Sequence, residues 1–393
     1  MDASLLNPEI QNYINSQIGN NVSKLALQKN PFPEINWISI LNQIAAKSKS
    51  KDKLPSYFST VNIIYPSKIS VEQTSSEKTA QYKSEIVNGD SLIDITGGFG
   101  VDCLYFSKKI KKVTHCEIDT ELSQIVNHNF KQFGIENVNC IAGDSFQTLT
   151  NSNCLFDWIY IDPSRRSDFK GKVFMLKDCT PNVSELLEFY FTKATNILIK
   201  TAPILDISAG LTELTNVKRI HIVAVENEVK ELLWELQADF IGVPEIKTIN
   251  ISDKKREEFL FKLNSNSEQP NFDFPKNYLY EPNTAIMKSG GFDEIGIQYS
   301  LSKLHPHSHL YTSMKMVEFP GRIFEIQKVF PYSKKEMKAK LENTKANITT
   351  RNFPDSVEEI RKKWKIKDGG VTYCFFTTDL NNDKIVLLCN KIN

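Results

Sequence analysis

Several features that would place a chain in a specialised class are missing from this sequence of 393 residues. Its seven cysteines form no C-x-x-C pair, and an odd count predicts free thiols in a reducing compartment. We find no basic-then-apolar leader, no apolar run long enough to cross a bilayer, no internal repeat and no low-complexity tract. These absences predict a cytoplasmic globular protein of about two to four domains, without a membrane partner.

Charge is nearly balanced over the whole chain, at a formal net charge of +1, but it is unevenly distributed. After residue 325 there are 14 Lys and Arg residues against 8 Asp and Glu residues, an excess of six positive charges. The rest of the chain is acidic by five charges. A basic segment that also holds Phe353 and Trp364 is typical of a surface for a phosphate backbone. For Arg361–Lys363 taken alone, a solvated helix face is the favoured interpretation, and the excess of charge over the whole segment is what indicates a phosphate backbone.

The most informative segment is Leu92–Asp102, Leu-Ile-Asp-Ile-Thr-Gly-Gly-Phe-Gly-Val-Asp. It predicts a short strand that ends at Asp94 and runs into a glycine-rich turn before a helix. The three glycines permit positive φ and let a ligand approach the backbone beside the free N–H groups of a helix start. Cys103 stands where a dinucleotide fingerprint needs its third glycine, so the turn does not fit NAD. An acidic residue before the turn suits an amino group, such as that of S-adenosylmethionine.

Polar side chains also follow the next four predicted strands. They are Glu117 after 113–116, Asp144 and Ser145 after 139–142, Asp162–Arg166 after 156–161, and Lys200 at the end of 196–200. Ligands of open parallel sheets bind outside the carboxyl ends of strands, so these tips predict one site. Glu117 would accept the ribose hydroxyls, and Asp144 with Ser145 would meet the adenine amino group. Each tip alone is equally typical of a helix N-cap or a tight turn, whereas their order and spacing favour a shared site.

The pattern along the chain predicts four parts. Residues 1–70 form an N-terminal helical region, with helices at 8–17, 22–28 and 37–47 and a solvated lysine-rich loop at 47–53. Residues 71–265 form a doubly wound α/β domain, with late strands at 218–225 and 258–263 and an amphipathic helix at 228–239. A linker at 264–270 leads to two small α+β units, 277–325 and 326–393. The last unit has helices at 334–341 and 357–364, a strand at 346–351 and a hairpin of 371–377 with 384–389.

Four motifs in this order resemble a known family. They are Glu72–Glu77 with Thr79–Lys83, Asp94–Asp102, Asp162–Arg166, and Asn347–Pro354 with Lys367–Gly370. Together they resemble bacterial class I S-adenosylmethionine-dependent methyltransferases with a C-terminal THUMP-like domain and a small ferredoxin-like insert. The resemblance implies a Rossmann-like class I methyltransferase fold with a mostly parallel seven-stranded sheet. It also implies S-adenosylmethionine as cofactor and an RNA substrate, because THUMP domains present RNA to catalytic domains.

The tip of the fourth strand indicates the chemistry. Enzymes that methylate exocyclic amines often have Asp/Asn-Pro-Pro-aromatic there, and this chain has Asp162-Pro163 followed by Ser164, Arg165 and Arg166. The acceptor half of the motif is present, and an Arg guanidinium can replace the missing ring in stacking on a base. The two arginines could instead clamp a phosphate or form surface ion pairs. Carbon-5 methylation needs a cysteine nucleophile, and Cys179 is the one nearby candidate, so a nitrogen acceptor is favoured.

The site prediction assigns three roles. Cofactor-binding residues are Ser76, Thr79, Asp94, Thr96, Gly97, Gly98, Gly100, Glu117, Asp144 and Ser145. Catalytic residues are Asp162, Pro163 and Arg165, and substrate-binding residues are Arg165, Arg166, Lys200, Arg351, Lys362 and Lys363. Ser76 and Thr79 belong to a hydroxyl-rich run that, in methyltransferases, often folds over the methionine carboxylate, and a helix cap explains them equally well. His305, His307 and His309 alternate, but they lack a carboxylate or cysteine cluster, so we expect no metal and place them on the solvent face of an edge strand.

The sequence therefore predicts an S-adenosylmethionine-dependent methyltransferase that acts on an exocyclic or ring nitrogen of a base in RNA. Two alternatives remain open: an RNA-binding protein with a vestigial methyltransferase fold, and a methyltransferase of a small molecule or a protein. The nucleotide, the atom and the oligomeric state do not follow from the sequence.

Overall fold

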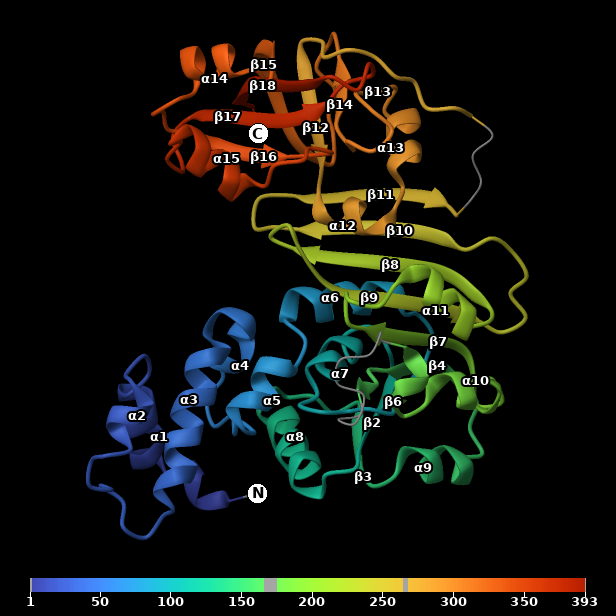
Figure 1. Cartoon of the computed structure of the whole chain (residues 1–393). Helices are drawn as coiled ribbons and strands as arrows, with labels where there is room; N and C mark the ends of the chain where they lie inside the picture. The colour runs from blue at the N-terminus through green and yellow to red at the C-terminus, as the bar shows by residue number, and fades with distance from the viewer. Residues whose placement is uncertain (1, 166–174, 264–267, 393) are drawn as a thin grey trace. The chain divides into compact units, whose positions relative to one another are not determined.

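The computed structural model describes residues 2–165, 175–263 and 268–392. These residues divide into two compact units, residues 1–218 with 232–242, and residues 219–231 with 243–393. Figure 1 follows the chain through both by colour. In the described part of the chain, no helix is both long and apolar enough to span a bilayer.

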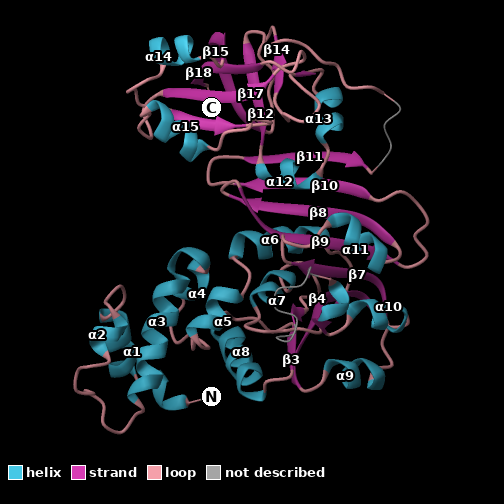
Figure 2. Ribbon diagram, viewed as in Figure 1, coloured by secondary structure: helices cyan, strands magenta, loops and turns pink. Residues whose placement is uncertain are grey.

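The N-terminal part of the first unit consists of short helices (Figure 2). They are η1 (Ala3–Leu6), α1 (Pro8–Ser16), α2 (Val22–Leu25), α3 (Trp37–Lys53), α4 (Pro55–Ser59), α5 (Lys68–Gln73) and α6 (Glu77–Ile86). An apolar cluster that includes Leu5, Ile14, Leu25 and Ile44 holds the first of them together. Side-chain N-caps begin six of the seven, as where the Asn36 side chain accepts the Ile38 N–H at 2.9 Å.

The lysine-rich segment 47–53, predicted as a solvated loop, is instead the end of α3. Lysine is a good helix former, so its abundance does not break a helix. Lys47 and Ser50 are buried, and the Ser50 hydroxyl donates to the carbonyl oxygen of Lys47 at 2.8 Å. The Lys53 ammonium donates to the carbonyl oxygen of Val71 at 3.1 Å. Charge composition alone predicted solvation here, and packing of the lysine stems overrides it.

The rest of the first unit is a doubly wound sheet with helices between its strands. In chain order the elements are β1 (Ser91–Asp94), α7 (Val101–Phe106), β2 (Lys112–Glu117), α8 (Thr120–Gln132), β3 (Val138–Ala142), α9 (Ser145–Asn151), β4 (Phe156–Ile161), β5 (Ser164–Arg165), η3 (Leu176–Asp178), β6 (Cys179–Thr180), α10 (Val183–Phe191), β7 (Ala194–Thr201), α11 (Ile207–Glu213) and β9 (Glu228–Gln237). The strands lie in the order β9-β7-β4-β1-β2-β3. All neighbours are parallel except β9, which runs antiparallel to β7. The strand order reverses between β1 and β4, and this switch point is where such sheets bind ligands.

The prediction of an amphipathic helix at 228–239 is wrong, because this segment forms strand β9. Leu232, Leu233, Trp234 and Leu236 are all fully buried, so both faces of the strand are covered. A strand buried on both faces loses its alternation and cannot be told from a helix by periodicity. The missed signal was the two-residue turn Glu226–Asn227, where both residues have positive φ, as tight hairpins require.

The second unit carries β8 (Val217–Val225), which pairs parallel with β10 (Glu245–Ile251), and β11 (Arg256–Lys262), antiparallel to β10. A separate seven-stranded sheet follows, in the order β13-β14-β12-β15-β18-β17-β16. Its elements are β12 (Tyr278–Pro282), α12 (Thr284–Ser289), α13 (Phe292–Gln298), β13 (Ser302–Lys303), β14 (Tyr311–Ser313), β15 (Gly321–Pro331), α14 (Lys334–Lys340), β16 (Asn347–Thr350), α15 (Val357–Trp364), β17 (Thr372–Thr378) and β18 (Lys384–Lys391).

Strand β15 joins the two halves of this sheet. Its first residues pair with β12, and residues 324–331 pair with β18. The predicted boundary between 325 and 326 therefore falls inside a strand that both halves share. The domain limits at 70, 265 and 325 stay predictions.

The histidine segment is not a solvent-facing edge strand. His305 is buried in the loop between β13 and β14, where its Nδ1 accepts the His307 N–H at 3.1 Å. The ring of His309 stacks on Phe292 at 3.6 Å. The described residues contain no cluster of three or more His, Cys, Asp or Glu residues that could hold a metal ion. The rings of His305 and His309 pack within this segment, whereas His307 is exposed.

Candidate cofactor and acceptor site

The glycine-rich turn after β1 is fixed by contacts that need glycine. A Cβ at Gly97 would lie 2.4 Å from Nε2 of His115, so the buried imidazole fills the space where a side chain would be. Burial lowers the pKa of His115, and its Nε2–H donates to the carbonyl oxygen of Gly98 at 3.2 Å. Gly98 and Gly100 have φ of 54° and 75°, the left-handed region that glycine tolerates best. The neutral histidine and the three glycines thus shape the turn together.

Asp94 ends β1 and is almost completely buried. Its Oδ1 accepts the Thr96 N–H at 2.9 Å, and its Oδ2 accepts the Cys103 thiol at 3.4 Å. Burial raises the pKa of this carboxyl to about 7, and the nearby Asp102 adds to the rise while the hydrogen bond from Thr96 opposes it. No ion pair to Asp94 is found among the described residues, and a buried carboxylate of this kind is suited to a cation such as a ligand ammonium.

Glu117 stands at the tip of β2 and ties the turn to the next helix. Its Oε2 accepts the Gly98 N–H and its Oε1 accepts the Asp119 N–H, each at 2.8 Å. Each oxygen keeps acceptor capacity beyond these bonds, so the carboxylate can still accept ribose hydroxyls. The two backbone bonds hold it in position at the strand end.

Asp144 and Ser145 follow β3, as predicted, but the exposed Asp144 carboxylate already acts as a helix cap. It accepts the Gln147 N–H at 2.9 Å. Both the N-cap interpretation and the adenine interpretation fit this position, since a capping carboxylate retains a second oxygen. The adenine role stays a prediction.

A cleft of about 240 Å³ opens at the carboxyl ends of β1 and β4. Its lining combines the predicted Asp94, Thr96, Gly97, Gly98 and Asp162 with Ser70, Gln73, Thr74, Ser75, Phe99, Val101, Asp102, Leu122 and Tyr160. Glu117 and Asp144 are not part of this lining, so the cleft does not include the residues predicted to bind the ribose and the adenine. It brings together the tips of β1 and β4, which the spacing of the motifs predicted.

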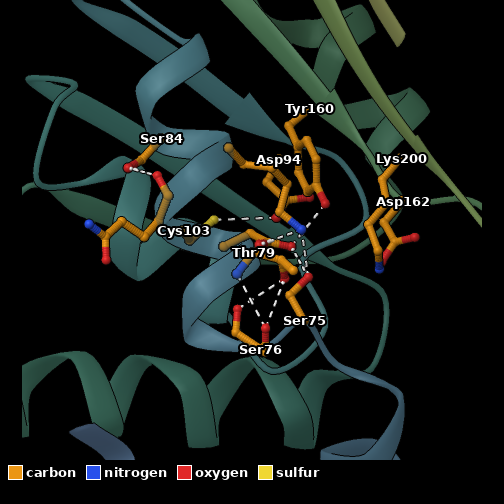
Figure 3. Close-up of polar contacts among 12 residues, drawn as sticks. Ser75, Ser76, Thr79, Ser84, Asp94, Cys103, Tyr160, Asp162 and Lys200 are labelled. Atoms are coloured by element: carbon orange, nitrogen blue, oxygen red, sulfur yellow. Dashed lines mark hydrogen bonds and ion pairs between the residues drawn. The ribbon is translucent and has the colours of Figure 1, made fainter. Parts of the chain in front are cut away.

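A buried ionic network behind this cleft was missed by sequence reasoning (Figure 3). Lys83 of α6 is completely buried and lies 3.0 Å from the carboxylate of Asp102. The other oxygen of Asp102 accepts the hydroxyls of Ser75 and Tyr160, both at 2.9 Å. Burial alone would raise the pKa of Asp102, but the Lys83 and Lys200 ammonium groups hold it below its ordinary value. The available signal was a lysine on the buried face of a helix. A lysine is almost never fully buried unless it is paired with an opposite charge.

Ser76 and Thr79 follow Ser75 in the sequence, and neither lines the cleft. Ser76 is the N-cap of α6, and its hydroxyl oxygen accepts the Thr79 N–H at 3.2 Å. Thr79 is buried, and its hydroxyl donates to the carbonyl oxygen of Ser76 at 3.1 Å. The structure thus places both in the helix cap that we held as the alternative, and of the same hydroxyl run it is Ser75 that faces the cleft.

Asp162 and Lys200, from the tips of β4 and β7, are brought together (Figure 3). The Lys200 ammonium forms an ion pair with the Asp162 carboxylate. The Asp162 backbone N–H donates to the Thr96 hydroxyl at 2.7 Å, which connects the acceptor end of the cleft to the glycine-rich turn. The predicted acceptor residue therefore lines the cleft and is paired with one predicted substrate residue, which is not itself part of the lining.

The rest of the fourth-strand motif is only partly described. Pro163 is half-buried, and Arg165 is exposed in β5, which pairs with β6. Arg166 lies outside the described residues. Cys179, the one candidate nucleophile, is completely buried, which disfavours covalent attack on a pyrimidine.

The substrate residues predicted in the second unit separate into different surroundings. Arg351 donates from Nη2 to Oε1 of Glu281 at 2.9 Å. Lys363 lies 3.5 Å from Asp355, and Lys362 is exposed on the same helix, α15. Arg351 and the α15 lysines therefore do not form one patch within this unit.

Comparisons with known proteins agree with this arrangement. Residues 89–225 match the family described as RNA cap guanine-N2 methyltransferase, residues 278–320 match a ferredoxin-like domain, and residues 321–391 match a THUMP domain-like family. The crystal structure of a protein from Porphyromonas gingivalis W83, provisionally named a methyltransferase, superposes with a TM-score of 0.88 at 29% identity over 100% of both chains.

A curated relative matches a much shorter part of the chain. An uncharacterized RNA methyltransferase of Mycoplasma mobile is 32% identical over 84 residues, which are 21% of this chain. The match spans 23% of that relative's own length. The fold, the glycine-rich turn and the two C-terminal matches agree with the resemblance of the motifs. The chain therefore carries a methyltransferase domain followed by a ferredoxin-like and a THUMP-like domain, in the order that the resemblance of the motifs implied.

Proposed function

We propose that this protein transfers a methyl group from S-adenosylmethionine to an exocyclic or ring nitrogen of a base in RNA. The observation that carries the proposal is the cleft at the ends of β1 and β4, which Asp94, the glycine-rich turn and Asp162 line together, with Lys200 paired to Asp162. One side suits a cofactor with an ammonium group, and the other suits a polar acceptor. Proximity and orientation in such a cleft supply most of the rate of an in-line displacement.

The cofactor end depends on charge and on shape. Asp94 accepts the ammonium of the methionine part, and Ser75, oriented by Asp102, offers its hydroxyl beside it. Gly97 and Gly98 allow the ligand to lie against the backbone. Glu117 accepts the ribose hydroxyls, and Asp144 with Ser145 meet the adenine. S-adenosylmethionine supplies the electrophilic methyl group when bound.

The acceptor end suits the edge of a base that carries a hydrogen-bond donor next to a hydrogen-bond acceptor. Asp162 accepts hydrogen bonds from an amino group, and the Lys200 ammonium donates to the neighbouring ring nitrogen or carbonyl oxygen. Holding the amine against a carboxylate directs its lone pair at the methyl group. Pro163 and Arg165 contribute a carbonyl acceptor and a planar cation, in place of the aromatic ring that related motifs use.

RNA as the substrate is supported by three independent features. The curated relative is named as an RNA methyltransferase, and the matched family is described by an RNA cap substrate. The C-terminal 68 residues carry an excess of six positive charges. A positive surface provides sequence-independent affinity for a phosphate backbone.

Two other functions remain as outcomes of the test. A protein that binds RNA and S-adenosylmethionine but methylates neither RNA nor any other acceptor has a vestigial methyltransferase fold. Methylation of a protein or small-molecule fraction, without methylation of RNA, assigns the enzyme to another substrate class. Both differ from the proposal in the methylated product.

The proposal is tested in two steps. Isothermal titration with S-adenosylmethionine measures the cofactor half, and transfer of label from methyl-labelled S-adenosylmethionine to total RNA measures the acceptor half. We expect Asp162→Asn and Lys200→Met to lower labelling of RNA by about 100-fold while binding of S-adenosylmethionine changes little. Asp239→Asn, an exposed carboxylate outside the cleft, is the matched control and keeps full activity. Equal activity of all three variants would contradict the assigned acceptor site.

A further inference from the structure

The second unit contains a cavity of about 390 Å³ with cationic side chains from four distant parts of the sequence. Lys255, Arg322, Arg351 and Lys391 line it, and three carboxylates, Glu226, Glu257 and Glu281, share the wall. The lining therefore has one formal positive charge in excess. The four cations lie at least 29 residues apart along the chain, so no single segment of the sequence predicts the cavity.

The two arginines are held by one buried carboxylate. The Glu281 side chain is only 3% exposed, and Arg322 and Arg351 approach it from β15 and from the end of β16. Arg322 uses its Nε and Nη2, which leaves Nη1 for another acceptor. Two guanidinium groups on one carboxylate leave a positive charge in excess and keep both forks in fixed orientation.

One buried donor in this cluster lacks an acceptor. Nε of Arg351 is inaccessible and has no hydrogen-bond partner among the described residues. A buried donor without an acceptor costs about 1–3 kcal/mol, more for a charged group. The Arg351 guanidinium therefore keeps one donor that the described part of the chain leaves without an acceptor.

Another part of the lining is held by contacts among its own polar side chains. The buried Glu257 accepts the side-chain amides of Asn250 at 3.0 Å and Asn283 at 3.2 Å, and it pairs with Lys255 at 2.6 Å. Lys391, at the end of β18, is exposed and has no ion pair within the described residues. The Lys255–Glu257 pair neutralises one part of the lining, and Arg322, Arg351 and Lys391 make another part cationic. The cavity is therefore preorganised for an anion of modest size.

We propose that this cavity binds a phosphate group of the RNA strand. The inference rests on the proposed function and deepens it, since it assigns a backbone contact of the substrate to Arg322, Arg351, Lys255 and Lys391. Planar, prepositioned guanidinium groups match the geometry of a phosphate, and a phosphate contact positions a strand without reading its sequence. This contact is separate from the basic face of α15.

Anisotropy of a fluorescently labelled RNA hairpin at several salt concentrations tests the cavity. We expect Arg351→Lys, which keeps the charge but loses the planar guanidinium, to weaken binding roughly fivefold with little change in the salt dependence. Lys391→Gln removes a charge and should weaken binding roughly fivefold and lower the slope of log affinity against log salt by about one. Lys328→Gln is the matched control, since Lys328 is an exposed lysine on the same strand as Arg322 but outside the cavity. Its affinity should equal that of the unmodified protein.

A change of opposite sign excludes damage to the fold as the cause. Glu226→Gln removes a negative charge from the wall and keeps the oxygen that accepts the Asp253 N–H at 3.0 Å, so it should tighten RNA binding about twofold. Unchanged RNA affinity in Arg351→Lys, Lys391→Gln and Glu226→Gln would overturn the proposal. If the unmodified protein binds no RNA, the proposed function fails first, which separates the two failures.

Free nucleotides are the competing source of the same chemistry. Uridine monophosphate and inorganic phosphate are therefore titrated against the unmodified protein and against Arg351→Lys. We expect both to displace the hairpin only at about millimolar concentration, because a single phosphate lacks the rest of the strand. Tight uridine monophosphate binding that is lost in Arg351→Lys while RNA affinity is unchanged would overturn the RNA assignment.

Discussion

The cofactor cleft and the cationic cavity are built from opposite patterns of sequence. The cleft gathers its polar groups from strand ends, and each group stands beside a recognisable strand or glycine-rich turn, such as Asp94 or Asp162. The cavity gathers Lys255, Arg322 and Arg351 from turns and strand ends with no shared motif. A parallel sheet converts spacing in the sequence into proximity, whereas an antiparallel sheet with long connections does not.

The two places also differ in how charge is held. In the cleft, Lys83 and Asp102 are buried as a pair, so each depends on the other. In the cavity, the guanidinium groups of Arg322 and Arg351 are about one third exposed, at 39% and 34%, and only their carboxylate partner is buried. Loss of a charge should therefore cost stability at the cleft and mainly ligand affinity at the cavity.

The largest effect is expected for Lys83→Met. The substitution leaves the carboxylate of Asp102 buried without its cation, which should lower the free energy of unfolding by about 3–5 kcal/mol. Urea denaturation measures this change. Adding Asp102→Asn to Lys83→Met removes the unpaired charge, so the double variant should recover most of the loss. Additive losses in the double-mutant cycle would contradict a coupled pair.

The next largest effect is expected for Asp94→Asn, which separates binding from stability. Without the carboxylate, the affinity for S-adenosylmethionine should fall by about 100-fold in isothermal titration. Burial in the folded protein raises the pKa of Asp94 from its ordinary value to about 7. At a pH between the ordinary value and about 7, the folded protein therefore binds more protons than the unfolded chain. Stability from this group is therefore lost as the pH rises toward 7, and the Asn variant avoids that loss.

The sign of this effect is measurable by thermal unfolding at two pH values. At about pH 8, Asp94→Asn should be more stable than the unmodified protein by about 1–3 kcal/mol, and at about pH 4 the two should be similar. In the unmodified protein, affinity for S-adenosylmethionine should rise with pH through about 7 as Asp94 ionises. A variant that is destabilised at both pH values would contradict a carboxyl that burial keeps protonated.

The smallest effect is expected from the α15 face. Replacing Arg361, Lys362, Lys363 and Lys365 with Gln should weaken binding of structured RNA about threefold, flatten its salt dependence and leave the affinity for S-adenosylmethionine unchanged. The effect is limited because Arg361 already pairs with Asp368 at 2.5 Å and Lys363 donates to the Tyr332 hydroxyl at 3.1 Å. If RNA affinity does not respond, α15 is a solvated face and the cavity alone carries the contact.

Sequence reasoning succeeded where local chemistry decides the structure. The strand end at Asp94, the turn that needs Gly97 and the helix Val357–Trp364 each have a local cause, and the fold class follows from their order. It failed where tertiary burial decides. Segment 228–239 is buried on both faces as a strand, and Lys53 extends a helix that charge composition had ended.

The same limit applies to the sites. Ser76 and Ser75 are neighbours in one hydroxyl run, and only the direction in which α6 begins places Ser75 at the cleft. Lys83 could not be linked to Asp102 from the sequence, because the contact forms between two helices. The density of basic residues at 361–365 led to the prediction of an RNA contact there, although two of these cations, Arg361 and Lys363, form ion pairs within the chain.

The most direct test of the central claim is nucleoside profiling of RNA after reaction with S-adenosylmethionine. RNA from a strain that lacks this protein is incubated with the unmodified protein or with Asp162→Asn, then digested and analysed by mass spectrometry. We expect one nitrogen-methylated nucleoside to appear with the unmodified protein and not with Asp162→Asn. A carbon-methylated nucleoside, or no methylated nucleoside from a folded protein that binds S-adenosylmethionine, would contradict the account.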